Sequence, residues 1–509
     1  MSLPSPLFFI TLIPLLAALF IMLGCPARFT ARLSSLALLA LTCVLWFAYQ
    51  PTPDSKFAFV SQYPILPEIG LSLSFGADGL SLAMLMLAAI VTVSAVWMIP
   101  PIKSREHLFY TCVMLISAGV VGAFASTDVL VFYAFHELAL IPTFLLIGIW
   151  GSGDRQAAAW KATIYLGLAS FVLLLGIVGL WLAMDPADRT FDLQTIQNLA
   201  ASGQIKPPHW VYWTLLLGFG TLISLFPFHS WAPQAYASAP TPAAMLHAGV
   251  LKKFGLYGML RLITPIFPDT ILNSKVAFLG LSLSYLDIFL VLLVGNLLYI
   301  GLVTIAQRRL DWMLGYSSVM HMGYIFLGIA ALNPLSLSGA GVLMFAHGLS
   351  IAALFALSGV VRERTHTLEF SELGGLAKPM PRLGLLFGFA AMASIGLPGF
   401  ANFPGELMVF FGAFGADNHV PMAHAALSGL QIATIIGVWG VVISAVYMLR
   451  AYRSVFFGTM PERWAGLADI APVPRCAVLV LVAALLIVGF CPQLLLAYIT
   501  PAISAISLP

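Results

Sequence analysis

The chain is a series of long apolar stretches separated by short segments rich in Pro, Gly and charge. An α-helix needs about 20 mainly apolar residues to cross the hydrocarbon core of a bilayer. Fourteen stretches approach this length, at residues 6–24, 34–50, 77–99, 108–126, 128–150, 160–184, 210–229, 241–263, 281–305, 313–332, 337–361, 383–412, 427–449 and 476–499. The pattern predicts an all-α polytopic membrane protein with about fourteen transmembrane helices.

Composition excludes a water-soluble protein. Hydrophobic residues make up 61% of the 509 residues and charged residues only 8%, whereas a soluble domain carries about 25% charged residues. Spans joined by short loops predict one membrane domain over residues 1–509, surrounded by the lipid bilayer. The net charge of +3 is small and the basic residues are scattered, so nucleic acid is not an expected partner.

No cofactor site is visible in the sequence. The five cysteines, Cys25, Cys43, Cys112, Cys476 and Cys491, have neither disulfide nor metal-site spacing. The chain has no Walker loop, no Gly-rich dinucleotide turn and no cysteine cluster for an iron–sulfur centre. We therefore expect no cofactor on this chain and any redox chemistry on another one.

The distribution of Lys and Arg predicts the topology, because the loops on the inner side of a membrane are enriched in basic residues. With the N-terminus outside, the inner loops hold sixteen: Arg28, Arg32, Lys103, Arg105, Arg155, Lys161, Arg308, Arg309, Arg362, Arg364, Lys378, Arg382, Arg450, Arg453, Arg463 and Arg475. The outer loops hold four: Lys56, Arg189, Lys206 and Lys275. Both termini are therefore expected outside. Lys252, Lys253 and Arg261 remain, and all three fall within one span.

Two spans contain helix breakers. Pro227 and Pro233 flank a polar segment in the seventh span, and residues 396–399, Gly-Leu-Pro-Gly, interrupt the twelfth. Non-helical backbone at membrane depth is tolerated where it is packed in protein or lines a wet cavity. The breaks lie five spans apart, an odd offset that reverses orientation. We therefore expect two inverted five-helix repeats, spans 4–8 (about 108–263) and 9–13 (about 281–449); two Pro kinks without function are the alternative.

Ionisable residues occupy the middle of several spans. Glu137 lies in the fifth span and Lys253 in the eighth, and a charge at such depth costs about 2.5–3.5 kcal/mol on insertion scales, so it usually has a function. Lys252 points about 100° away from Lys253 and is either a second relay residue or a charge tolerated by packing. Glu406 follows the break in the twelfth span, where a helix-capping role competes with a role in proton transfer.

Four histidines join these residues: His229, His247, His321 and His347. A single membrane histidine is as often an interhelical hydrogen-bonding residue as a proton carrier. Several Glu, Lys and His side chains along one interior allow the charge of one site to drive proton uptake or release at the next. The chemistry that the pattern indicates is ion relay.

Six stretches resemble the antiporter-like subunits of proton-pumping NADH:quinone oxidoreductase, respiratory complex I. They are residues 135–151, 227–231, 239–258, 316–323, 346–350 and 396–406, in the same order as in the family. A Glu at position 406, fourteen spans and the absence of a long C-terminal amphipathic helix resemble subunit M rather than L or N.

The resemblance implies a site and an assembly. Glu137, Lys253, His321, His347 and Glu406 would form the proton relay, with Glu406 as its terminal site. The chain would work beside antiporter-like L and N neighbours in a bacterial inner membrane, with both termini periplasmic. NADH, FMN, iron–sulfur clusters and quinone would be bound by partner subunits.

The chain departs from the family at two places. The family's lysine on the seventh span, five residues before Pro227, is Leu222 here, so Glu137 lacks its usual partner and either stays protonated or pairs with His136, His229 or a lysine of the eighth span. Before the tenth span, Arg309 and Asp311 stand where the family often has an acidic residue followed by Lys.

Two other functions fit the same residues. The chain could belong to a cation/proton antiporter or an inorganic-carbon uptake complex, which the neighbouring genes would reveal. It could also be a structural spacer that pumps no protons, which proton stoichiometry would reveal.

Overall fold

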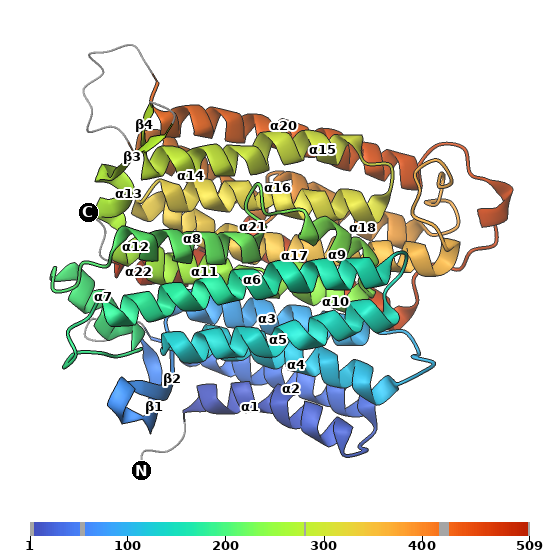
Figure 1. Ribbon diagram of the computed structural model, residues 1–509. Coiled ribbons are helices and arrows are strands. Elements are labelled where there is room, and N and C mark those ends of the chain that lie inside the picture. Colours follow the sequence, from blue (N-terminus) through green and yellow to red (C-terminus); the bar gives the residue numbers. More distant parts are fainter. Residues whose placement is uncertain (1–4, 51–55, 279–280, 417–426, 507–509) are drawn as a thin grey trace.

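The computed structural model describes residues 5–50, 56–278, 281–416 and 427–506, in which long helices run side by side in one bundle (Figure 1). Among these residues, ten helices are long and apolar enough to cross a membrane: α2 (Ala27–Ala48), α3 (Gly79–Trp97), α4 (Glu106–Ala125), α5 (Val129–Trp150), α6 (Arg155–Leu182), the helical run Tyr285–Ala306, α16 (Leu310–Ala330), α17 (Pro334–Thr365), α20 (Gly429–Phe456) and α21 (Pro472–Phe490). Shorter apolar helices are α1 (Pro6–Met22), α8 (His209–Ile223), α18 (Pro381–Ile395) and α22 (Gln493–Ser504). Each predicted stretch coincides with a helix or a run of helical segments, so the all-α polytopic fold is confirmed.

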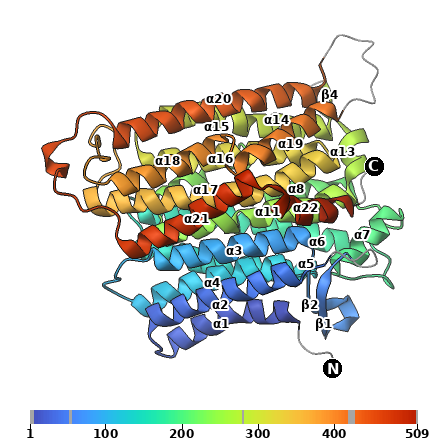
Figure 2. The ribbon, with the colours of Figure 1, turned by 180° about the vertical axis from the view of Figure 1, so that it is seen from behind.

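Two short hairpins and two short helices lie outside the bundle, at one of its ends (Figures 1 and 2). Strand β1 (Ala58–Leu66) pairs with β2 (Leu71–Ala77), and β3 (Lys275–Phe278) pairs with β4 (Leu281–Ser284), both antiparallel. Helix α7 (Leu193–Ala201) lies at the same end, as does α13 (Pro268–Asn273). The pattern of apolar stretches did not predict these elements, because they are short and partly polar. All four basic residues expected outside lie in or next to them.

Acidic caps fix where two central helices begin. The carboxylate of Asp78 accepts a hydrogen bond from the backbone N–H of Ser81 (2.9 Å) at the start of α3. Asp128 accepts from the N–H groups of Leu130 (2.9 Å) and Val131 (3.0 Å) at the start of α5. Such caps satisfy donors that a helix start leaves free.

The break in the seventh span is confirmed. Helix α8 ends at Ile223, and seven residues, beginning with Ser224 at φ +71°, separate it from α9 (Trp231–Ser238). The side chain of Asn296 accepts from the N–H of Phe226 (2.7 Å) and donates to the carbonyl of Ser224 (3.1 Å). A side chain of the ninth span thus satisfies backbone groups that the break frees, as the membrane interior requires.

The break in the twelfth span is confirmed as well. Helix α18 ends at Ile395 and α19 (Asn402–Gly415) follows. Gly396 and Gly399 between them have φ +83° and +93°, the left-handed region that favours glycine. The inverted relation between residues 108–263 and 281–449 stays a prediction.

Three spans are less regular than the sequence indicated. The eighth is a run of α10 (Thr241–Leu246), a π-helical turn (His247–Leu251), α11 (Lys253–Gly258), a second π turn (Met259–Ile263) and α12 (Thr264–Ile266). The ninth joins α14 (Tyr285–Val294) and α15 (Ile300–Ala306) through a π turn (Gly295–Tyr299). The fourteenth is divided into α21 and α22 at Pro492, which has no N–H to donate. π turns inside α-helices occur frequently at functional sites.

Burial separates inner from outer helices. Helices α3, α16 and α17 are buried along nearly their whole length, whereas α2, α20 and α21 expose most of their apolar surface. Helix α17 packs against α16 and α19, and against the first π turn of the eighth span. The ionisable residues of the eighth, tenth and eleventh spans therefore lie in the centre of the bundle.

Candidate proton relay

The two lysines of the eighth span are fully buried and reach different neighbours. The ammonium of Lys253 donates to the carbonyl of Ala248 (2.7 Å), within the first π turn. The ammonium of Lys252 donates to the carbonyl of Ser318 on α16 (3.3 Å) and lies 5.6 Å from the centre of the Tyr236 ring. The expected divergence of the two side chains is present, and Lys252 is the one that contacts the tenth span.

Ser318 connects that lysine to the histidines. Its hydroxyl lies 3.4 Å from Nε2 of His347 on α17, while its carbonyl accepts from Lys252. The ring of His347 stacks on the ring of His321 on α16, with centroids 5.2 Å apart and an angle of 4°. Lys252, Ser318, His347 and His321 thus form a contiguous series, called here the lysine–histidine series.

His321 lies between two backbone carbonyls. Its Nδ1 is 2.8 Å from the oxygen of Ser317, and its Nε2 is 2.8 Å from the oxygen of Ser394, near the end of α18. A neutral imidazole has a single N–H to donate, whereas the imidazolium has two. The protonated ring therefore satisfies both carbonyls, and the Ser394 contact brings the series to the break in the twelfth span.

Glu406 lies on the far side of that break. It is 4% exposed on α19, and its carboxylate approaches Gly396 so closely that a Cβ added there would collide with it. Helix α19 has Ala401 at its N-cap and no side-chain cap hydrogen bond. Glu406 is the fifth residue of α19, and its role, in capping or in proton transfer, stays a prediction.

Glu137 is the most exposed member of the predicted site. Its side chain is 37% exposed, faces a cavity of about 220 Å³ between α5 and α6, and accepts a hydrogen bond from the hydroxyl of Ser170. Nδ1 of His136 is 3.6 Å from its carboxylate. The His136 ring also stacks on Phe254, next to Lys253, with centroids 4.1 Å apart. Of the proposed substitutes for the missing lysine at position 222, the structure places His136 beside Glu137.

The sequence comparisons decide the family. The family described as NADH:quinone oxidoreductase/Mrp antiporter, transmembrane, matches residues 126–431, more than half of the chain. The chain belongs to this family. It is a proton-translocating membrane subunit of the NADH:quinone oxidoreductase/Mrp antiporter type, as the resemblance predicted.

Relatives within the family share about a third of the sequence. The chain is 34% identical to NAD(P)H-quinone oxidoreductase chain 4-3 of Nostoc sp., over 89% of this chain and 78% of that protein. It is 34% identical to a chain 4 of the same oxidoreductase from Thermosynechococcus vestitus, over 95% and 88%. A chain 4 from Synechococcus elongatus is 35% identical over the same shares.

Solved structures agree on the fold. The chain resembles one from respiratory complex I of Thermus thermophilus with bound NADH, with a TM-score of 0.85, 26% identity and 98% of both chains covered. It also shares its fold with a chain of the Mrp complex of Dietzia sp., with a TM-score of 0.81 and 21% identity over 99% of this chain and 98% of that one.

Two histidines of the predicted site lie apart from the lysine–histidine series of this family member. His229 lies in the break of the seventh span, its ring stacked on Phe226 with centroids 5.7 Å apart. His247 opens the first π turn and packs against the rings of Trp231 and Tyr236, each 5.5 Å away. Both ring nitrogens of His247 are buried without a hydrogen-bond partner among the described residues.

The acidic partner of Arg261, the third basic residue of the eighth span, was not predicted from the sequence. The guanidinium of Arg261 donates to the carboxylate of Asp78 (2.5 Å) and to the hydroxyl of Ser81 (3.1 Å), both at the start of α3. In the sequence, Asp78 is only the second residue of the third apolar stretch. A buried Arg in one span and an acid at the start of another are the signal that could have suggested the pair.

The reversed charges before the tenth span still pair. Arg309 and Asp311 are 2.9 Å apart, and Arg309 also lies 3.7 Å from Glu369. In this family member the exchange of acidic and basic positions therefore keeps an ion pair at this site. Within the described part of the chain, no group of three His, Cys, Asp or Glu side chains could hold a metal ion.

Proposed function

We propose that this chain is the M-type subunit, chain 4, of a membrane-bound NAD(P)H:quinone oxidoreductase and relays protons through its buried Glu, Lys and His side chains. The observation that carries the proposal is the lysine–histidine series, because it joins the eighth, tenth and eleventh spans in the most buried part of the bundle. The relatives of about 34% identity, each named as chain 4 of that oxidoreductase, support the parent complex.

The groups in the series suit proton transfer. An ammonium can release a proton, a hydroxyl can accept one and donate another, and an imidazole nitrogen can take one up. Because neighbouring sites interact, a proton that arrives at one site favours release from the next. The ammonium of Lys252 contacts the carbonyl of Ser318 and not its hydroxyl, and the His347 and His321 rings stack without a hydrogen bond, so in this proposal water carries the proton from Lys252 to His347 and on to His321. The two carbonyl partners of His321 favour its protonated form.

The two glutamates are proposed for the ends of the path. Glu137, with His136 beside it, supplies protons from the cavity between α5 and α6, and the His136 stack on Phe254 leads to Lys253. Glu406 receives protons beyond the break in the twelfth span. Lys253 is the central residue, and His229, His247 and Lys252 have supporting roles.

Buried polar atoms near Glu406 are consistent with a hydrated path. The side-chain amide of Asn402, the hydroxyl of Tyr324 and the hydroxyl of Ser338 are buried without protein hydrogen-bond partners among the described residues. They lie on α19, α16 and α17, three helices that pack on one another. Buried polar groups without a protein partner ordinarily bind water, which conducts protons between fixed groups.

The proposal extends to the assembly. NADH, FMN, iron–sulfur clusters and quinone are bound by partner subunits, and antiporter-like L and N subunits flank this chain in a bacterial inner membrane. Both termini face the periplasm, since the four outer basic residues lie in or next to the elements at one end of the bundle.

Replacement of Lys253 tests the function. In the Lys253→Met variant of the assembled complex, we expect both quinone reductase turnover and proton pumping in vesicles to be lost, because a coupled path without its central carrier stops redox turnover as well. Lys275→Met, at an exposed lysine in β3 outside the bundle, is the matched control and should leave both activities unchanged.

The same measurement separates the alternatives. Unchanged turnover and pumping in an assembled Lys253→Met complex would make this chain a spacer and overturn the proposed relay. Loss of both activities in the Lys275→Met control as well would show that the assay reports assembly damage rather than proton transfer.

A further inference from the structure

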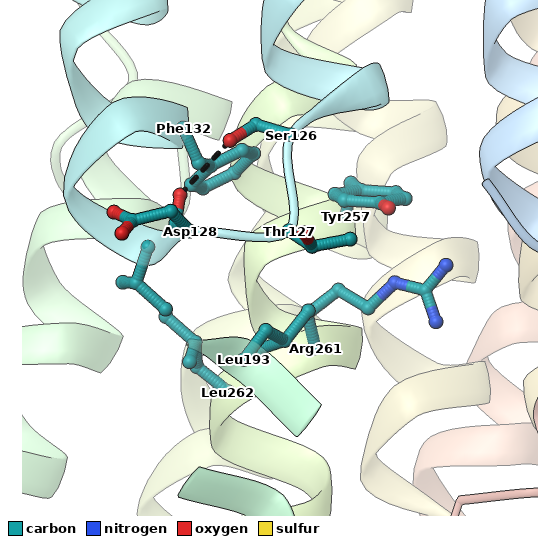
Figure 3. Close-up of a pocket in the computed structure, with 9 residues that line it drawn as sticks. Ser126, Thr127, Asp128, Phe132, Leu193, Tyr257, Arg261 and Leu262 are labelled. Atoms are coloured by element: carbon teal, nitrogen blue, oxygen red, sulfur yellow. Dashed lines mark hydrogen bonds between the residues drawn. The ribbon is translucent and has the colours of Figure 1, made fainter. Parts of the chain in front are cut away.

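The buried pair of Arg261 and Asp78 has no part in the proposed relay. Both residues are almost fully buried, Arg261 in the second π turn of the eighth span and Asp78 at the start of α3. Figure 3 shows Arg261 beside Tyr257, with Asp128 across a small pocket of about 10 Å³, room for about one water molecule, that both Arg261 and Tyr257 line. A buried ion pair is weak evidence for stability, because desolvation offsets the attraction.

The pair lies two turns after Lys253 on the eighth span. Lys253, Tyr257 and Arg261 follow one another at intervals of four residues, so eight residues, about 12 Å of helix, separate Lys253 from Arg261. The hydroxyl of Tyr257 lies 2.8 Å from that of Ser81, which accepts from Arg261. Polar groups thus connect Tyr257, one turn after Lys253, to Arg261, whereas the ammonium of Lys253 itself contacts Ala248.

Arg261 ends this series with a charge that it cannot give up. Guanidinium stays protonated at any physiological pH, so it cannot pass a proton on. It is also held in place: Asp78, fixed as the cap of α3, binds it at 2.5 Å, and the Tyr257 ring lies 4.7 Å from its central carbon. A fixed positive charge in a narrow passage excludes protons and other cations.

We propose that Arg261 is an electrostatic barrier that closes the direct route from Lys253 to the hairpin end of the bundle, with Asp78 as its positioning residue. The inference rests on the proposed function, because the barrier protects a proton path that includes the lysines. Protons at Lys253 and Lys252 must then leave through His347 and His321 toward Glu406. Without the barrier, protons would cross the membrane without redox work.

Two variants separate a barrier from a structural tie between the helices. In Asp78→Asn/Arg261→Met, the charge and the pair are both absent, whereas Asp78→Asn alone lacks the ion pair but keeps the positive charge of Arg261. Asn is as good a helix cap as Asp, so α3 keeps its start in both. A barrier predicts a leak only in the first variant; a structural tie predicts equal effects in the two.

The readout is passive proton flux into liposomes that hold the purified complex, driven by a potassium diffusion potential without NADH. We expect the flux for Asp78→Asn/Arg261→Met to be at least about ten times that of the unaltered complex. Removal of one fixed charge lowers the energy barrier that a cation must cross by enough to raise the rate at least about tenfold. Asp78→Asn alone should match the unaltered complex. Equal fluxes in all three, or equal leaks in both variants, would overturn the proposal.

Two additions keep the test decisive. If the Met variant does not assemble, Asp78→Asn/Arg261→Gln removes the same charge and keeps a hydrogen bond at the site, with the same expected leak. Adding Lys253→Met to the leaking variant should return the flux to the basal level. A leak that persists in that triple variant would overturn the assignment of this route to Lys253. If the triple variant has no leak but the single Lys253→Met variant pumps normally, the proposed relay is refuted and the proposed barrier stands.

Discussion

The imidazole rings of His321 and His347 lie parallel, with centroids 5.2 Å apart, and come from α16 and α17. Two imidazolium charges at this separation repel each other strongly in a buried site. The pair therefore holds one proton more readily than two. Since His321 contacts two carbonyls and His347 contacts the hydroxyl of Ser318, the proton is better accommodated on His321, which gives the transfer a direction.

Replacing either histidine with Phe should separate proton transfer from packing. His347→Phe keeps a ring in the stack but removes the nitrogen next to Ser318, so we expect a normally assembled complex with little proton pumping. His321→Phe also leaves the carbonyl of Ser394 without its donor, which costs about 1–3 kcal/mol, so the amount of assembled complex should fall too. Pumping in vesicles and native gel electrophoresis measure the two effects, and normal pumping in the His347→Phe variant would contradict a relay through this stack.

The fold was predictable because the apolar stretches, the helix breakers and the basic residues of the loops all indicated the same helices. The apolar stretches predicted the helices of the bundle, and Pro227 and the glycines at 396 and 399 predicted the two breaks, since these residues have backbone requirements that no tertiary contact removes. The π turns around Lys253 were not predictable. An extra residue in a helical turn leaves the apolar pattern almost unchanged.

The residues of the site were predictable, but their connections were not. Depth in a span singled out Lys253, whereas the contact to the histidines is made by Lys252 through Ser318, a common residue that no pattern distinguishes. Likewise, Asn296 supports the break in the seventh span from seventy residues away. Such contacts depend on how helices pack, and one sequence gives no measure of that.

The approach of Glu406 to Gly396 predicts a sensitive position in the break. Gly396→Ala places a methyl group against the carboxylate and also forces a side chain into the left-handed region, which costs about 1–2 kcal/mol. We expect displacement of Glu406 and a loss of pumping comparable to that of Glu406→Gln. Gly399→Ala is the matched control: it has similar backbone strain at φ +93°, but its methyl group makes only ordinary contacts with Phe490. Equal pumping in the two alanine variants would show that strain, and not the position of Glu406, determines the effect.

Asp128, just before α5, ties the β1–β2 hairpin to the bundle, and its protonation makes that tie depend on pH. Its carboxylate accepts a hydrogen bond from the N–H of Ser72 in β2 (3.0 Å). Burial raises the pKa of Asp128 to about 6, although hydrogen bonds from the backbone N–H groups of Ser72, Val131 and Leu130 oppose the shift. Because the pKa is higher in the folded state than in the unfolded one, the folded state is favoured at low pH. This contribution is lost as pH rises through about 6.

Limited proteolysis within the segment that precedes α3 measures this dependence. Asp128→Asn still caps α5 but cannot titrate, so the ratio of the cleavage rate of the unaltered complex to that of the variant cancels the pH dependence of the protease. Between pH 5.5 and 7.5 the ratio should rise about fourfold. This is the change in the equilibrium constant for local opening that a folded-state pKa near 6 gives, and the cleavage rate follows that constant. A constant ratio would mean that the carboxyl of Asp128 does not titrate in this range, and a falling ratio would mean that its ionised form stabilises the hairpin.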